Sequence, residues 1–82
     1  MIFLPVQCRM ARAALGWGVR DLAAAAKVSI DTVARFERGE ELKVRTIEAM
    51  QRALEAGGIE FIDANGGGAG VRLKKRHIRK RS

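Results

Sequence analysis

The side chains of this chain that could do chemistry are mainly cations, and they gather toward one end. Seven of the sixteen Lys and Arg residues lie within residues 72–81, so residues 1–71 hold nine basic and nine acidic residues. Dense cationic runs attract phosphates whatever the sequence, and they are common footprints of nucleic-acid binding. A solvated tail that merely keeps the protein soluble is the alternative. We favour the phosphate-binding role and predict a flexible basic tail over residues 74–82. Its cations are Lys74, Lys75, Arg76, Arg79, Lys80 and Arg81.

Catalytic chemistry has few candidates. The chain has no tyrosine and one histidine, and no plausible pair of carboxylates or of nucleophile and base is evident. His77 lacks cysteine, histidine or carboxylate neighbours at ligand spacing, which argues against a metal site. We therefore expect neither enzymatic activity nor a cofactor nor a metal.

The single cysteine, Cys8, excludes an internal disulfide and fits a reducing compartment, and we expect it to be a small core residue. The apolar segment Met1–Val6 is too short for a signal peptide or a membrane span. The expected location is cytoplasmic, with no membrane partner.

Residues 19–38 contain the elements that would position any recognition surface. Leu22, Ala23 and Ala26 recur at helical spacing, and Ser29 is a good N-cap for a second helix from Ile30 to about Arg38. Between the two helices Lys27 takes a turn position that would be strained in the left-handed conformation. In the second helix Val33 and Phe36 point one way and leave the other side free. The sequence predicts two short helices joined by a tight turn.

The pattern L-A-x-x-x-x-V-S-x-x-T-V-x-x-x-E-R-G, from Leu22 to Gly39, resembles the helix-turn-helix of the lambda-repressor-like family, also called the XRE family. The resemblance continues through the Q-C-R-x-A-R-x-x-L-G-W run at residues 7–17 and the R-T-I-x-x-M-x-x-A-L-E-x-x-G run at residues 45–58. It implies a mainly α fold with four helices and binding to double-stranded DNA, which would also make the protein nucleoid-associated. Val19 departs from the family, where glutamine is common and contacts a phosphate.

The resemblance implies that the helix from Ile30 enters the major groove. Arg35 can bind guanine O6 and N7, and Asp31 can accept from cytosine N4 or, alternatively, only stabilise the helix dipole. The apolar groups can contact thymine methyls. The expected base contacts are Ile30, Asp31, Thr32, Ala34 and Arg35, and the expected phosphate contacts are Arg20, Ser29, Arg38, Lys43 and Arg45.

Two further expectations concern acidic residues. Arg12 shares the inward side of the first helix, and the family pattern implies an ion pair with Glu37 that ties this helix to the recognition helix. In the following linker, Glu40 and Glu41 would be repelled by DNA, so we expect them to point away.

The remaining elements follow from periodicity. We expect a first helix over about residues 5–15 that frays at its start, because Leu4 is a poor N-cap, and a fourth helix from about Arg45 to Ala56. Residues 59–63 and 71–73 alternate as strands around a glycine-rich turn. The predicted core is Leu15, Trp17, Leu22, Val28, Val33, Phe36, Ile47, Met50 and Leu54.

The expected organisation is a DNA-binding domain at residues 5–57, a β-hairpin at residues 58–73 and the basic tail. A lone hairpin is marginal in water, so it must pack on the helices or pair with its copy, and we favour pairing.

The leading hypothesis is a sequence-specific transcriptional regulator, a repressor acting as a homodimer. The alternative is an antitoxin or adaptor of the same fold, with a toxin or another protein as partner. RNA binding through the tail is a third option, although exposed stacking aromatic residues are missing.

Overall fold

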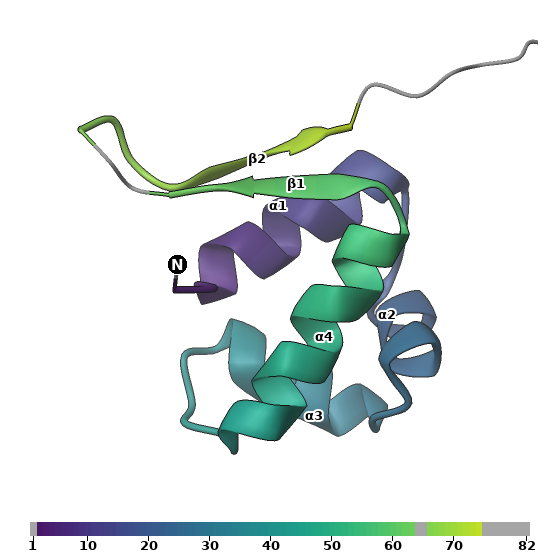
Figure 1. Ribbon diagram of the computed structural model, residues 1–82. Coiled ribbons are helices and arrows are strands. Elements are labelled where there is room, and N and C mark those ends of the chain that lie inside the picture. The colour runs from purple at the N-terminus through teal and green to yellow at the C-terminus, as the bar shows by residue number, and fades with distance from the viewer. Residues whose placement is uncertain (1, 64–65, 75–82) are drawn as a thin grey trace, which may run out of the picture.

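The computed structural model describes residues 2–63 and 66–74, and it confirms the expected fold class. Four helices are followed by an antiparallel two-stranded sheet (Figure 1). The elements are α1 (Pro5–Leu15), α2 (Val19–Ala26), α3 (Ile30–Glu37), α4 (Val44–Ala56), β1 (Ile59–Ile62) and β2 (Gly70–Leu73). No helix within the described residues is long and apolar enough to cross a membrane.

The core lies where the four helices meet. Five of the predicted core residues are buried, namely Leu22, Val33, Phe36, Met50 and Leu54. The other four are half-buried against this cluster: Leu15, Trp17, Val28 and Ile47. Phe3 and Ile59 are buried although neither was predicted. Phe3 explains how the helices and the hairpin share one core, because its ring lies 5.1 Å from that of Phe36 and 4.9 Å from that of Phe61.

Gln7 stabilises the start of α1, where Leu4 has no side chain that could cap the helix. Its Oε1 accepts a hydrogen bond of 2.9 Å from the backbone N–H of Leu4. Its Nε2 donates to the carbonyl oxygens of Ile62 and Gly70, both at 3.1 Å. The expectation of a frayed start overlooked this fully buried side chain, which fixes α1 at its first turn and also joins it to both strands of the hairpin.

The turn between α2 and α3 is formed by residues that lie next to one another in the sequence. Ser29 caps α3 by accepting from the N–H of Thr32 at 3.0 Å. Lys27 has the left-handed conformation, with φ of 60°, and the N–H of the next residue, Val28, bonds the carbonyl of Ala23. A side chain at this φ is strained, so lysine here stores a small conformational cost.

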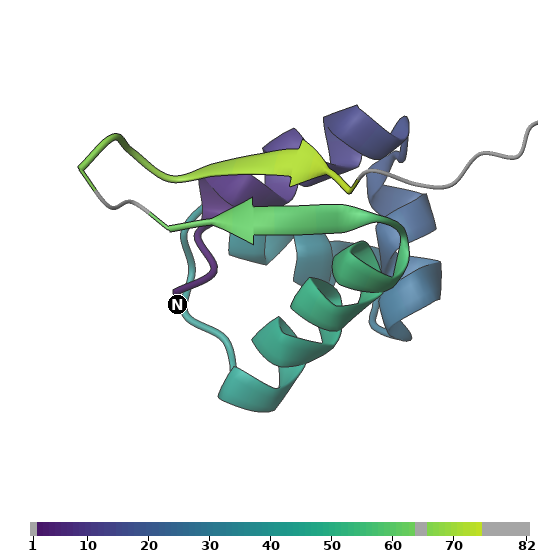
Figure 2. The same ribbon diagram turned by 45° about the horizontal axis from the view of Figure 1, so that its top comes forward.

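The hairpin lies across α1 and the C-terminal end of α4, while α3 is at the opposite end of the molecule (Figures 1 and 2). Ile59 is fully buried, and Phe61 and Val71 pack against the helical core. The hairpin therefore buries its apolar face within one chain, so packing on the helices already meets the need for burial. Pairing with a second copy stays a prediction.

Replacing Gln7 with methionine, which has similar volume, should lower the free energy of unfolding by about 1–3 kcal/mol, because two carbonyls and one N–H lose their partner. Urea denaturation monitored by circular dichroism measures this. Gln51→Met is the control, since Gln51 makes one long bond of 3.4 Å to Glu55 on the same helix. Equal effects of the two changes would contradict the role of Gln7.

Candidate nucleic-acid interface

One side of α3 is free for recognition because the other side is buried. Val33 and Phe36 face the core, whereas Ile30 is 48% exposed and Asp31 is also exposed. Thr32, Ala34 and Arg35 are half-buried. The Thr32 hydroxyl lies 2.8 Å from the Ser29 hydroxyl at the start of the helix. The five expected base-contact residues thus share a short helix whose first turn is capped.

The second half of α3 carries an ion-pair network that corrects one expectation. Glu40 does not point away from the recognition helix. Its Oε1 is 2.9 Å from Nε of Arg35, and its Oε2 is 2.9 Å from Nη2 of Arg38. Gly39 explains the difference, because its φ of 92° turns the chain back and lets the N–H of Glu40 bond the carbonyl of Arg35 at 3.1 Å.

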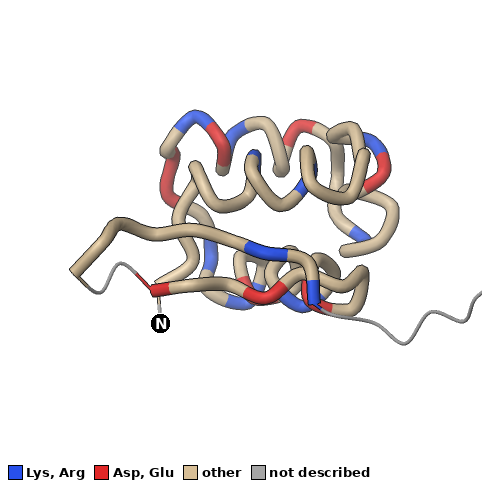
Figure 3. Tube along the Cα trace, turned by 90° about the horizontal axis from the view of Figure 1, so that it is seen from above, with Lys and Arg blue, Asp and Glu red and all other residues tan. Residues whose placement is uncertain are grey.

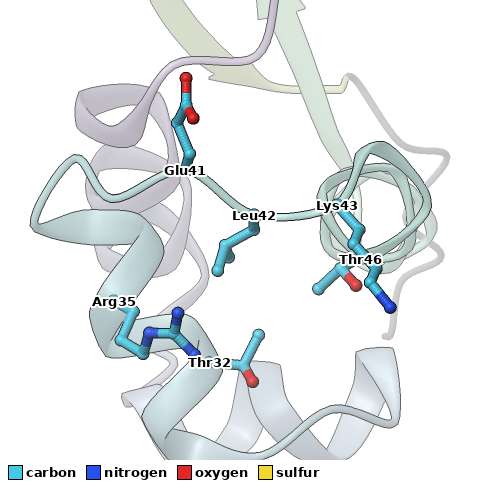
Figure 4. A pocket seen from close by; sticks show the side chains of 6 residues that line it. All are labelled: Thr32, Arg35, Glu41, Leu42, Lys43 and Thr46. Carbon is cyan, nitrogen blue, oxygen red and sulfur yellow. The ribbon is translucent and has the colours of Figure 1, made fainter.

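A hollow of about 580 Å³ separates α3 from the start of α4. Its lining comes from both helices and from the linker that joins them: Thr32, Arg35, Glu41, Leu42, Lys43 and Thr46 (Figure 4). Arg35 and Lys43 approach it from opposite sides, as Figure 4 shows.

Basic and acidic segments alternate along much of the trace (Figure 3), so local pairing decides which cations are available. Arg20, Lys43 and Arg45 are exposed and take part in none of the ion pairs found in residues 2–63 and 66–74. Each lies at a helix start, where the helix dipole also favours anions. Ser29 is exposed at the start of α3 as well, whereas Arg38 is held by Glu40.

Glu37 fixes the inner side of α3 to α1. Arg12 forms a two-pronged ion pair with it, at 2.7 Å from Nε to Oε2 and 2.8 Å from Nη2 to Oε1. The side chains of Arg12 and Glu37 are only 18% and 10% exposed. The Nη1 of Arg12 also donates to the carbonyl of Trp17, so one guanidinium joins α1, the next loop and α3.

Two contacts at Glu37 were not predicted. Arg9 donates to the backbone carbonyl of Glu37 at 2.6 Å, and the Cys8 thiol lies 3.1 Å from Glu37 Oε2. The spacing of Cys8 and Arg12, four residues apart on one helix face, was the available signal. Burial of Cys8, with the nearby Glu37 carboxylate, raises the pKa of the thiol far above its ordinary range and keeps it protonated.

Ionisation of Glu37 is favoured by these same neighbours. Burial alone would raise the pKa of the carboxyl group, but hydrogen bonds from Arg12 and Cys8 and the positive charges of Arg12 and Arg9 outweigh it. The pKa of Glu37 is therefore lowered from its usual value of 4.5.

Lys74 is the one residue of the expected basic tail that lies within the described part of the chain. Lys74 is exposed, and its backbone N–H bonds the carbonyl of Gly58 at 2.7 Å beyond the last strand. The other expected tail contacts, Lys75, Arg76, Arg79, Lys80 and Arg81, lie outside the described residues, as does His77. Within the described residues, no group of three or more His, Cys, Asp or Glu side chains could hold a metal ion.

Two helices joined by a tight turn, with the second capped, clamped on one side and free on the other, define a helix-turn-helix domain. The family model of a helix-turn-helix domain matches residues 6–61. The chain belongs to this family, in agreement with the lambda-repressor-like pattern, and the domain indicates a DNA-binding regulator. A comparison with curated proteins found no match.

Changing Glu37 to glutamine should lower the free energy of unfolding by about 3 kcal/mol at neutral pH, because it leaves the shielded Arg12 without its counter-charge. Since the pKa of Glu37 is lowered on folding, its stabilisation is present above pH 4.5 and is lost as the pH falls below that value. Urea denaturation at a series of pH values measures both effects.

The control is Glu48→Gln, because Glu48 forms an exposed pair of 3.8 Å with Arg52 on α4. This change should alter the stability by less than about 0.5 kcal/mol. If the free energy of unfolding fell by the same amount in Glu37→Gln and in wild type as the pH is lowered below 4.5, Glu37 would not be the group whose protonation lowers the stability.

Proposed function

We propose that this protein is a sequence-specific transcriptional repressor that reads the major groove of double-stranded DNA with α3. It acts as a homodimer in the cytoplasm, bound to the nucleoid. One observation carries the proposal: the two sides of α3 have different surroundings. The inner side is fixed by the ion pair of Glu37 and by the core, while the outer side presents side chains that can contact bases. A helix held this way can enter the groove as a rigid body.

The residue types on the outer side limit which bases are read. Arg35 is the main candidate for guanine, since a guanidinium can donate to O6 and N7 together. Ile30, Ala34 and the Thr32 methyl suit thymine methyl groups, because each offers an apolar contact. Asp31 either accepts from cytosine N4 or stabilises the helix dipole at the first turn of α3.

Phosphate contacts complete the interface on both sides of α3. Arg20 and Ser29 stand at the starts of α2 and α3, and Lys43 and Arg45 stand at the start of α4. Their support comes from exposure and, for the cations, from the absence of an ion pair in the described part of the chain. Arg38 joins this set only when Glu40 releases it.

Dimerisation is proposed through the hairpin, residues 58–73. Within the described residues, β1 and β2 pair only with each other, so each has one edge without a strand partner. Pairing of one such edge with its copy would extend the sheet across a two-fold axis. Two copies of α3 would then read half-sites about one helical turn apart on palindromic DNA.

Selection of bound sequences from a random DNA pool, at near-physiological salt with the full-length protein, tests the function directly. An enriched palindrome supports dimeric, sequence-specific binding, and its half-site spacing tests the dimer. Enrichment of no sequence would overturn the proposal and favour the antitoxin or adaptor alternative, in which the domain acts through protein contacts.

Arg35→Ala should weaken binding to the selected site by about 1–3 kcal/mol and change binding to random DNA little. Fluorescence anisotropy with labelled duplexes measures both affinities. Arg52→Ala is the matched control, because Arg52 is an exposed arginine of α4 that already pairs with Glu48. Equal losses on both DNAs would show that Arg35 binds a phosphate instead of a base.

Replacing the five basic residues of 75–81 with glutamine should flatten the salt dependence of binding by about 0.9 in log–log slope for each phosphate that the tail no longer neutralises. Sequence preference should be unchanged. An unchanged slope would contradict a DNA-binding tail.

A further inference from the structure

The carboxylate of Glu40 bonds Arg35 of α3 and Arg38, the C-cap residue of that helix, in two different ways. Its Oε1 accepts one bond from Arg35, 2.9 Å from Nε. Its Oε2 accepts two bonds from Arg38, at 3.2 Å from Nε and 2.9 Å from Nη2. One acidic side chain therefore constrains two cations on the surface that we propose meets DNA.

The position of Glu40 is determined by the end of α3. The N–H of Gly39 bonds the carbonyl of Phe36 at 2.9 Å, and the N–H of Glu40 bonds the carbonyl of Arg35 at 3.1 Å. These two bonds hold the backbone of Glu40 against the last turn of the helix. This backbone position places the carboxylate of Glu40 within hydrogen-bond distance of Arg35 and Arg38.

As a result, Arg35 and Arg38 differ in which guanidinium nitrogen atoms are bonded to Glu40. The Nη1 and Nη2 atoms of Arg35 bond no other residue in the part of the chain that the structure describes, whereas its Nε is occupied. This leaves Arg35 the pair of donors that fits guanine O6 and N7. Both Nε and Nη2 of Arg38 donate to Glu40, so this pair of donors is not available for a phosphate.

We propose that Glu40 is a positioning residue that makes Arg35 selective for guanine and restrains Arg38 from phosphate binding. The inference rests on the proposed DNA-binding function. Fixing Nε of Arg35 reduces the side-chain freedom that is lost when the base is bound. The negative charge of Glu40 also weakens attraction to every phosphate nearby, so specificity is gained at the expense of overall affinity.

Glu40 can be tested without loss of the fold. The side chains of Arg35, Arg38 and Glu40 are 42%, 58% and 43% exposed, and exposed ion pairs contribute little to stability. Glu40→Ala and Glu40→Gln should therefore unfold at nearly the same urea concentration as wild type. Glu41→Ala is the matched control, because it removes the same charge from the same linker and Glu41 makes no ion pair in residues 2–63 and 66–74.

The first measurement is made on the free protein. The Nε–H signal of Arg35 in a ¹H–¹⁵N NMR spectrum should exchange slowly with water in wild type and in Glu41→Ala, and rapidly in Glu40→Ala. Equal exchange in wild type and Glu40→Ala would show that the ion pair does not restrain Arg35 in solution, which would overturn the proposal before DNA is added.

The second measurement compares the affinity for the selected site, for the same site with its guanine changed at the Arg35 position, and for random DNA. In Glu40→Ala the preference for guanine should fall about two- to fivefold, the effect of losing an exposed ion pair. Binding to random DNA should tighten, with the log–log salt slope steeper by about 0.9 if Arg38 binds one phosphate.

The controls separate this role from charge repulsion alone. Glu41→Ala should tighten binding to random DNA without lowering the preference for guanine, and Glu40→Gln, which keeps one acceptor oxygen, should restore part of the preference. An unchanged preference in Glu40→Ala would overturn the role of Glu40 while leaving the proposed function intact. A wild-type protein that selects no sequence would overturn both.

Discussion

The ion pair between Arg12 and Glu37 is the contact on which the placement of the recognition helix depends. α3 has only eight residues, and an isolated helix of that length does not persist in water. Its orientation comes from Glu37, which is bonded by three residues of α1, and from Val33 and Phe36 in the core. The pair is largely shielded from water, so the two side chains are held in one arrangement. The orientation of α3, and with it the position of its outer side, is fixed as a result.

Two glutamates three residues apart perform opposite tasks at the end of this helix. Glu37 is shielded and faces α1, so its charge is balanced inside the protein. Glu40 is exposed and faces Arg35 and Arg38, so its charge acts on the surface proposed to meet DNA. Gly39 separates the two roles, because the left-handed turn at this residue reverses the direction of the chain between them.

The features that could be predicted from sequence are those with local causes. The Ser29 cap and the four helices depend on residues within a few positions of one another, and the hairpin shows its own alternation. The features missed depend on distant partners or on a turn. Gln7 meets carbonyls 55 and 63 residues away, and Glu40 returns to α3 only because of Gly39. Residue types indicate the turn at Gly39, but they do not indicate which partners the side chains of Gln7 and Glu40 reach.

The reach of Gln7 across the chain has a consequence for synthesis on the ribosome. α1 is made early, but the side-chain amide of Gln7 can bond Ile62 and Gly70 only after these residues are translated, 55 and 63 residues later. Until then the first turn of α1 has neither strand to pack against, and Phe3 lacks Phe61. Final closure of this fold is therefore a late event in translation, and a nascent chain paused before the hairpin exposes apolar surface to chaperones and proteases.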